Sequence, residues 1–125
     1  QPRESVVFKI YVPANKFEMF GSGNEKRDFG YIDDQIKSII LLSRKVKRPN
    51  GDIFNIASGK AFTIKNIVNK LVKISKKKVS YNFTQKRRSF DNQYYIADKS
   101  KLNKTIGSIK YTDINVALKK TFDSY

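Results

Sequence analysis

The first residues of this sequence with a spacing that could bind phosphate are Gly21 and Gly23, which flank a serine. Glycine-rich loops hold phosphate oxygens against backbone N–H groups. A dinucleotide fingerprint requires G-x-G-x-x-G, but the sixth position here is Lys26, and the P-loop pattern does not occur. We therefore expect the two glycines to form a turn that needs positive φ angles or close approach of the chain.

Arg27 follows this turn and has binding chemistry of its own. A guanidinium group between a turn and a short strand is fixed at its base, and its planar fork suits phosphate oxygens. Asp28 could hold that fork or cap a turn. The alternative is a surface arginine paired with Asp28 or Glu25, and the local sequence alone favours this alternative.

A second pair of candidates, Arg88 and Asp91, lies in the polar segment "RRSFD". The arginine could bind a diphosphate and the aspartate could accept hydrogen bonds from ribose hydroxyls, although a solvated basic loop is the simpler interpretation. Asp33 and Asp34 resemble a pair of catalytic carboxylates. Because they stand at the predicted start of a helix, we expect them to cap it instead.

The composition limits the possible chemistry. The 125 residues suffice for one domain, and they carry a formal charge of +15. There is no Cys and no His, which excludes disulfides, thiol chemistry and the commonest metal ligand and general base. No apolar run is long enough for a membrane helix and no signal peptide is visible, so a cytoplasmic protein is expected.

The charge leaves a second function open. Basic clusters occur in "KISKKKVS" and "KRRSF", near Tyr81, Phe83 and Phe90. Such aromatic residues could stack on bases, so the alternative is a small basic nucleic-acid-binding module. A Lys-rich solvated surface explains the same charge without any ligand.

The hydrophobic pattern predicts an α/β fold, a small mixed subdomain of short strands and about four helices. Strands are expected in "FEMF", "FGYI", "DIFNIAS", "VSYNF" and "YYIAD". One helix begins at Asp33 or Asp34, and its apolar face is expected to comprise Ile36, Ile39 and Ile40. The other helices are expected after the cap Thr63 with a stripe of Ile64, Ile67, Val68 and Leu71, from Asp98 to Lys104 before Gly107, and from Thr112 or Asp113 with Ala117 and Leu118 inside.

Taken together, these segments resemble one family. "GSGNEKRDFGYIDDQIKSI" resembles the stretch GdGxxxRDFxyVdDva of the extended short-chain dehydrogenases/reductases, the NAD-dependent sugar-nucleotide epimerases and dehydratases. "DIFNIASGKAFTIKNIVNKL" resembles their xyNigsGxxxsixelaxxi, and "RRSFDNQYYIADKSKLNKTIG" resembles their RxGDxxxxxaDxskaxxxLG. "QPRESVVFKIY" and "YTDINVALKKTFDSY" are similar to the segments that begin at YGPR and close the family's last helix.

The resemblance implies a site for a nucleotide diphosphate sugar. Arg27 would reach the diphosphate, with Phe29 in the same pocket, and Phe20 would border the nucleobase. Arg88 and Asp91 would contact phosphate and ribose, and Tyr95 would line the pocket. The reaction class would be epimerisation or dehydration at a sugar carbon through transient oxidation by NAD.

The match covers only the C-terminal, substrate-binding part of the family. We therefore expect residues 1–125 to form a nucleotide-sugar-binding subdomain without the Rossmann NAD-binding domain, as a truncated or split enzyme. Tyr95 and Lys99 have the spacing of the family's catalytic Tyr-x-x-x-Lys pair but lie in the wrong segment. The chain alone is accordingly expected to have no catalytic residues, no metal and no bound cofactor. It is expected to be inactive by itself, and a separate Rossmann-domain chain is a possible partner.

Overall fold

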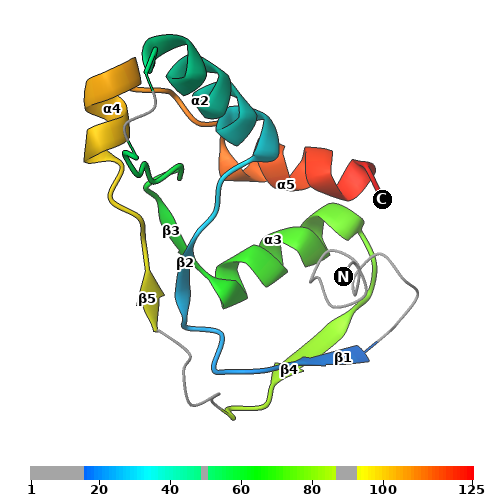
Figure 1. Cartoon of the computed structure of the whole chain (residues 1–125). Coiled ribbons are helices and arrows are strands. Elements are labelled where there is room, and N and C mark those ends of the chain that lie inside the picture. The colour runs from blue at the N-terminus through cyan, green and yellow to red at the C-terminus, as the bar shows by residue number, and fades with distance from the viewer. Residues whose placement is uncertain (1–15, 49–50, 87–92) are drawn as a thin grey trace.

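The computed structural model of the chain describes residues 16–48, 51–86 and 93–125. Within these ranges there are two small sheets and four helices (Figure 1). The strands are β1 (Lys16–Met19), β2 (Lys26–Asp28), β3 (Ala61–Thr63), β4 (Ser80–Phe83) and β5 (Tyr94–Tyr95). The helices are α2 (Ile32–Lys45), α3 (Ile64–Ser75), α4 (Ser100–Ile106) and α5 (Ile114–Asp123). The predicted mixed α/β fold is confirmed.

One sheet has three strands, with β2 at its centre. Strand β3 is antiparallel to β2 and β5 is parallel to it. The other sheet consists of β1 and β4, which run parallel, with Phe17 opposite Tyr81. The turn from residue 20 to residue 25 joins β1 to β2, so it connects the two sheets directly (Figure 1).

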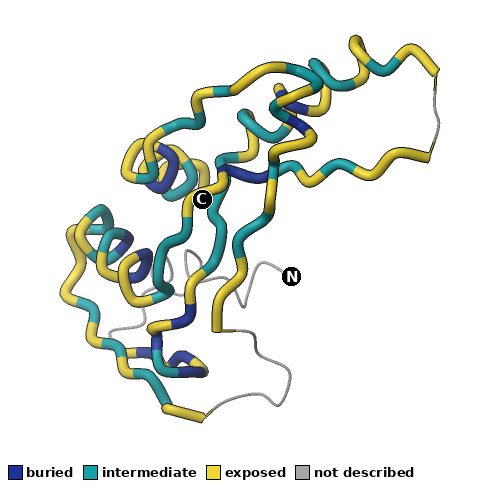
Figure 2. The backbone as a smooth tube through the Cα atoms, turned by 90° about the vertical axis from the view of Figure 1, so that its left-hand side faces the viewer, coloured by how far each residue is buried: buried dark blue, intermediate teal, exposed yellow. Residues whose placement is uncertain are grey.

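The core lies where α3 packs against α5 and against β1. Ile67, Val68 and Leu71 of α3 are buried as the apolar stripe predicted, together with Phe17 and Met19 of β1. Figure 2 shows that buried positions are few and that much of the backbone is exposed or half-buried. The stability of this core therefore depends on a small set of side chains.

The helix ends follow the predicted capping residues in three places. The hydroxyl of Thr63 accepts a hydrogen bond from the N–H of Asn66 at 3.1 Å, at the start of α3. Asp113 accepts one from the N–H of Asn115 at 2.8 Å, at the start of α5. Helix α4 ends at Gly107, which adopts a positive φ of 83°. These predictions are confirmed, because short polar side chains and glycine satisfy the groups that a helix end leaves unpaired.

Helix α2 lies where the sequence predicts it, and its predicted apolar face is exposed. Ile32, Ile36, Ile39 and Ile40 keep between 44% and 57% of their surface accessible. The buried residue is Ser38, whose hydroxyl donates to the carbonyl of Asp34 at 2.8 Å and lies 3.3 Å from the hydroxyl of Tyr111. Ser38 and the half-buried Leu41 and Leu42 therefore face the rest of the described chain, while the isoleucines face outward.

Asp33 and Asp34 do not cap α2 with their side chains, contrary to expectation. The N-cap is Tyr31 and receives no side-chain hydrogen bond. The carboxylate of Asp34 instead accepts hydrogen bonds from the N–H of Thr112 at 2.8 Å and from its hydroxyl at 3.1 Å. This carboxylate thus joins the start of α2 to the segment that leads into α5.

Two predicted strands also differ from the structure. In place of "FGYI", the strand is Lys26–Asp28, because these residues pair with β3 and β5 while Gly30 and Tyr31 lead into α2. The segment "DIFNIAS" has the pattern of a buried strand, yet residues 51–60 are in no strand and Ile53 is 82% exposed. Within the described ranges, no neighbouring strand supplies the pairing that this pattern anticipates.

Candidate functional site

The backbone N–H groups of Gly21, Ser22 and Asn24 in the glycine turn already donate hydrogen bonds within the protein. The carboxylate of Glu25 accepts hydrogen bonds from the N–H of Ser22 at 2.8 Å and from its hydroxyl at 3.0 Å. The N–H of Asn24 donates to the Ser22 hydroxyl, and the N–H of Gly21 donates to the carbonyl of Lys86 at 3.0 Å. These donors are therefore not available to cradle a phosphate, and the prediction that the glycines serve a turn is confirmed.

Both glycines of this turn are required by geometry. Gly21 and Gly23 have φ angles of 89° and 81°, which side chains rarely tolerate. A Cβ atom on Gly23 would lie 2.5 Å from Cζ of Phe83, and one on Gly21 would lie 2.7 Å from Oε1 of Glu25. The turn is thus closed over the end of β4 on one side and over the Glu25 carboxylate on the other.

Glu25 is a buried carboxylate that remains ionised. Burial alone would raise the pKa of Glu25, but the hydrogen bonds from Ser22 and from the turn's backbone N–H groups outweigh this, and its pKa lies below the ordinary value. The carbonyl of Glu25 also accepts a hydrogen bond from the N–H of Ile64 at 3.0 Å. Glu25 thus fixes the turn and joins it to the start of α3. Arg27 follows Glu25 by two residues in the chain.

Arg27 occupies the centre of the three-stranded sheet. It lies directly opposite Phe62 of β3 and Tyr95 of β5. Paired residues of adjacent strands point to the same face, so the side chains of Phe62 and Tyr95 leave the sheet on the same face as Arg27. The Nη1 group donates to the carbonyl of Lys26 at 3.0 Å, and the Arg27 side chain is half-buried. The sheet therefore holds the base of Arg27 rigidly, as the sequence predicts.

Asp28 has a role that differs from both roles suggested by the sequence. One of its carboxylate oxygens accepts hydrogen bonds from the N–H and the hydroxyl of Ser58, at 3.0 and 2.6 Å. The other accepts from the N–H of Gly59 at 2.9 Å. Asp28 therefore ties β2 to the segment that enters β3, and so stabilises the sheet that carries Arg27.

The remaining predicted site residues are placed as follows. Tyr95 is 61% exposed beside Arg27, and Phe20 is 59% exposed immediately before the glycine turn. Phe29 is half-buried and lines a cavity described below. Arg88 and Asp91 lie outside the described residues, so their expected contacts with phosphate and ribose stay predictions.

Both described ends of the segment that carries Arg88 and Asp91 are anchored beside the turn. The carbonyl of Lys86 accepts from Gly21, and the carbonyl of Gln93 accepts from the N–H of Lys26 at 2.8 Å. These two hydrogen bonds bring both ends of the segment to the stretch between Gly21 and Lys26. The anchoring agrees with a shared site, while the convergence of Arg27 and Arg88 remains untested.

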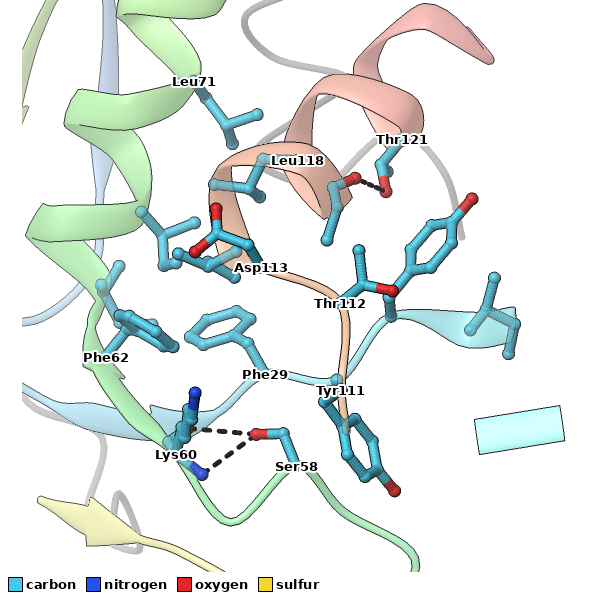
Figure 3. A pocket seen from close by; sticks show the side chains of 17 residues that line it. Phe29, Ser58, Lys60, Phe62, Leu71, Tyr111, Thr112, Asp113, Leu118 and Thr121 are labelled. Carbon is cyan, nitrogen blue, oxygen red and sulfur yellow. Dashed lines mark hydrogen bonds between the residues drawn. The ribbon is translucent and has the colours of Figure 1, made fainter. Parts of the chain in front are cut away.

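A cavity of about 480 Å³ lies between the three-stranded sheet, α3 and α5 (Figure 3). Apolar side chains form most of its wall, including Phe29, Phe62 and Leu118. Arg27 is not among the residues that line it. Lys60, Phe62 and Tyr111 were not predicted as cavity residues from the sequence. Only the pairing of β3 with β2 and the position of the segment before α5 bring them together.

Lys99 does not form a catalytic pair with Tyr95. Its ammonium donates to the carbonyl of Ser58 at 2.7 Å and lies 4.8 Å from the centre of the Tyr111 ring. Lys99 thus connects the start of α4 to segments 58–59 and 111. The prediction that this tyrosine–lysine spacing is coincidental agrees with these contacts.

The aromatic residues proposed for nucleic-acid stacking are used differently. The Tyr81 ring stacks on the Phe17 ring with 5.9 Å between the ring centres, and it meets the Phe83 ring edge-on with 5.7 Å between the centres. Both Tyr81 and Phe83 pack against the core. Phe90 lies outside the described residues. Among the described residues there is no cluster of three potential metal ligands, and no helix is long and apolar enough to cross a membrane.

Comparison with known proteins agrees with this geometry. Residues 5–57 match the model of the NAD dependent epimerase/dehydratase family. A UDP-glucuronic acid 4-epimerase from Bacillus cereus, solved with UDP-glucuronic acid and NAD, superposes on 97% of this chain with a TM-score of 0.82 and 24% identity. The resemblance to the NAD-dependent epimerase/dehydratase family is confirmed.

Two further proteins are similar to this chain. An NDP-hexosamine 5,6-dehydratase, TunA, superposes on 98% of the chain with a TM-score of 0.79 and 21% identity. An uncharacterised protein of Sinorhizobium fredii, y4nL, is 35% identical over 68 residues, which are 54% of this chain and 19% of that protein. At identities below 25%, the two solved structures show the fold alone.

The chain spans only part of the proteins that it resembles. It covers 39% of the B. cereus epimerase and 40% of TunA. The N–H groups of Gly21, Ser22 and Asn24, which a glycine-rich loop would offer to the pyrophosphate of NAD, already donate to Lys86, Glu25 and Ser22.

Proposed function

We propose that this chain is the nucleotide-sugar-binding portion of an NAD-dependent epimerase/dehydratase. Its task is to hold the diphosphate and orient the sugar, while a Rossmann domain, joined to this chain or supplied as a separate chain, holds NAD. In that division of labour this chain contributes binding energy and orientation, and NAD, when bound, accepts and returns the hydride.

The observation that carries this proposal is the position of Arg27. Its backbone is fixed on both sides by paired strands, and its neighbours on the same face are Phe62 and Tyr95. A preorganised guanidinium fork loses little entropy when it binds two phosphate oxygens. Tyr95 is exposed and can contact a sugar or ribose beside that diphosphate.

The outward face of α2 supports the proposal of a missing domain. Ile32, Ile36, Ile39 and Ile40 form an exposed apolar stripe on α2, whose buried residue is Ser38. Such an arrangement is unfavourable in water unless another surface covers the stripe. The solved relatives have well over half of their length outside the part that this chain matches, and that part is our proposed cover.

The segment at 52–57 supports the same docking arrangement. It has the sequence of a buried strand, but in the described structure it belongs to no strand and Ile53 is exposed. A segment with a strand-like sequence that lies outside any sheet can be added to the edge of a sheet. We propose that it pairs with the sheet of the Rossmann domain, next to the isoleucines of α2.

Calorimetric titration of the chain with UDP sugars and with NAD tests the proposed division of labour. We expect binding of at least one UDP sugar and no micromolar binding of NAD. A shallow dependence of the affinity on salt is expected, because few phosphates are contacted. Tight binding of NAD would contradict the proposal. Binding of oligonucleotides instead of UDP sugars, with an affinity that falls steeply with salt, would also contradict it.

A further inference from the structure

We infer that the cavity between the three-stranded sheet, α3 and α5 is a second ligand site, which binds a small aromatic or alicyclic carboxylate. Its volume of about 480 Å³ is within the usual range for small-molecule sites, roughly 300–1,000 Å³. Phe29 and Phe62 line it but Arg27 does not, so the cavity adjoins the proposed diphosphate contact without including the guanidinium group.

The wall of the cavity suits a flat apolar body. Two phenylalanine rings, Phe29 from the end of β2 and Phe62 from β3, stand at the wall in Figure 3. Leu71 and Leu118 line it from α3 and α5, and both are buried core residues. Aromatic rings that meet another ring prefer offset or edge-on contacts, which add to the gain from burying apolar surface.

Most polar side chains at this wall are already engaged; Tyr31 also lines it, and the ammonium group of Lys120 lies 5.4 Å from the centre of its ring. The Asp113 carboxylate accepts hydrogen bonds from the N–H and the side-chain amide of Asn115, at 2.8 and 3.0 Å. The hydroxyls of Ser58, Thr112, Thr121 and Tyr111 are hydrogen-bonded to Asp28, Asp34, Ala117 and Ser38. The ammonium group of Lys60 has no hydrogen-bond or ion-pair partner among the described residues.

The charge of the expected ligand follows from the ammonium group of Lys60, which is available to a ligand. Lys60 lies next to an apolar wall, where a carboxylate gains more from an ammonium group than it does in open water. Asp113 is the acidic residue that lines the cavity. The hydrogen bonds from Asn115 hold the pKa of Asp113 below its ordinary value, so its carboxylate keeps its charge and is already hydrogen-bonded to Asn115. The site therefore selects an anion, with the apolar body on Phe29 and Phe62.

Three matched probes test this inference on the whole chain: 2-naphthoate, the neutral 2-naphthamide and the cationic 2-naphthylmethylammonium. The sequence contains no Trp, so naphthalene fluorescence is read without a tryptophan background. We expect 2-naphthoate to bind more tightly than the amide by roughly threefold to tenfold, the range of an ion pair in contact with water. Lys60→Gln should remove this difference, and Lys65→Gln, outside the cavity, should keep it.

A second variant tests the location of the site. Thr121→Leu adds volume at the cavity wall on α5 and should weaken all three probes, with folding checked by circular dichroism. Arg27→Ala should leave 2-naphthoate binding unchanged, and this result separates the site from the diphosphate contact whether or not UDP sugars bind. Equal affinity for all three probes, preference for the cation, or insensitivity to both Lys60→Gln and Thr121→Leu would overturn the inference.

Discussion

Arg27 and Tyr95 are direct partners in a parallel pair of strands, although they lie in different sequence motifs. Strand β5 consists of Tyr94 and Tyr95 alone, and it begins one residue after the anchored carbonyl of Gln93. This pairing places the exposed Tyr95 ring beside the guanidinium group of Arg27. A sugar nucleotide bound at Arg27 would therefore meet Tyr95 as its neighbour on the same face.

The contact between Asp28 and segment 58–59 is expected to stabilise the sheet around Arg27. Asp28→Ala removes an acceptor of three hydrogen bonds and should lower the free energy of unfolding by about 1–3 kcal/mol, because the donors of Ser58 and Gly59 lose their partner. Chemical denaturation measures this loss. Asp123→Ala, which removes only an exposed ion pair with Lys119, is the control and should change stability by less than about 0.5 kcal/mol. Equal losses in the two variants would contradict this role of Asp28.

The Glu25 carboxylate should make folding sensitive to acid. Because its folded-state pKa is lowered from the ordinary value of 4.5, the carboxylate stabilises the folded state above about that pH, and this contribution is lost as the pH falls through the lowered pKa. Glu25→Gln should be less stable than the wild type at neutral pH, and the difference between the two should shrink in acid. Thermal unfolding across a pH series measures the difference. A gap that stays constant or widens in acid would refute the assignment.

Gly23 is expected to be irreplaceable for two reasons that can be separated. Gly23→Ala introduces strain at a φ of 81° and a clash with the Phe83 ring at 2.5 Å. Gly107→Ala meets the same strain at a φ of 83°, but no heavy atom lies within 4 Å of its Cβ. We expect about 1 kcal/mol of destabilisation for Gly107→Ala and at least 1 kcal/mol more for Gly23→Ala, measured by denaturation. Similar losses would mean that Phe83 moves aside freely.

The isoleucines of α2 should control association. The double variant Ile36→Lys and Ile39→Lys should abolish binding to a Rossmann domain of this family and reduce self-association of the chain, while its unfolding free energy changes little. Sedimentation and a binding assay with a purified Rossmann domain measure both effects. Val116→Lys, on the exposed side of α5, changes an apolar residue of similar exposure and is the matched control. Loss of binding in the control alone would place the interface elsewhere.

Sequence patterns predicted the α3 and α5 helices because local and tertiary signals agree there. Thr63 and Asp113 cap helices whose apolar stripes are buried, so period and capping lead to the same answer. Periodicity predicted the apolar face of α2, but it does not reveal what covers that face. The strand predicted at 52–58 was wrong for a similar reason. A strand forms only when another strand pairs with it, and the sequence pattern does not show that partner.

The candidate site was only partly visible in the sequence. Arg27, Phe29 and Tyr95 could be selected from motifs that resemble the family. Lys60 and Phe62 could not, because their relation to Arg27 depends on the register between β2 and β3. The role of Asp28 was also hidden, since Ser58 and Gly59 are distant in the sequence and join Asp28 only in the folded chain.

The central claim, that Arg27 binds the diphosphate of a nucleotide sugar, is tested most directly by calorimetry. The wild type, Arg27→Lys and Arg27→Ala are titrated with one UDP sugar, and Arg44→Ala on the exposed end of α2 serves as the control. We predict a loss of about 1.5–3 kcal/mol in binding free energy for Arg27→Ala, partial recovery in Arg27→Lys because an ammonium group cannot form the fork, and no change for Arg44→Ala. Equal affinities of the wild type and Arg27→Ala would contradict the account.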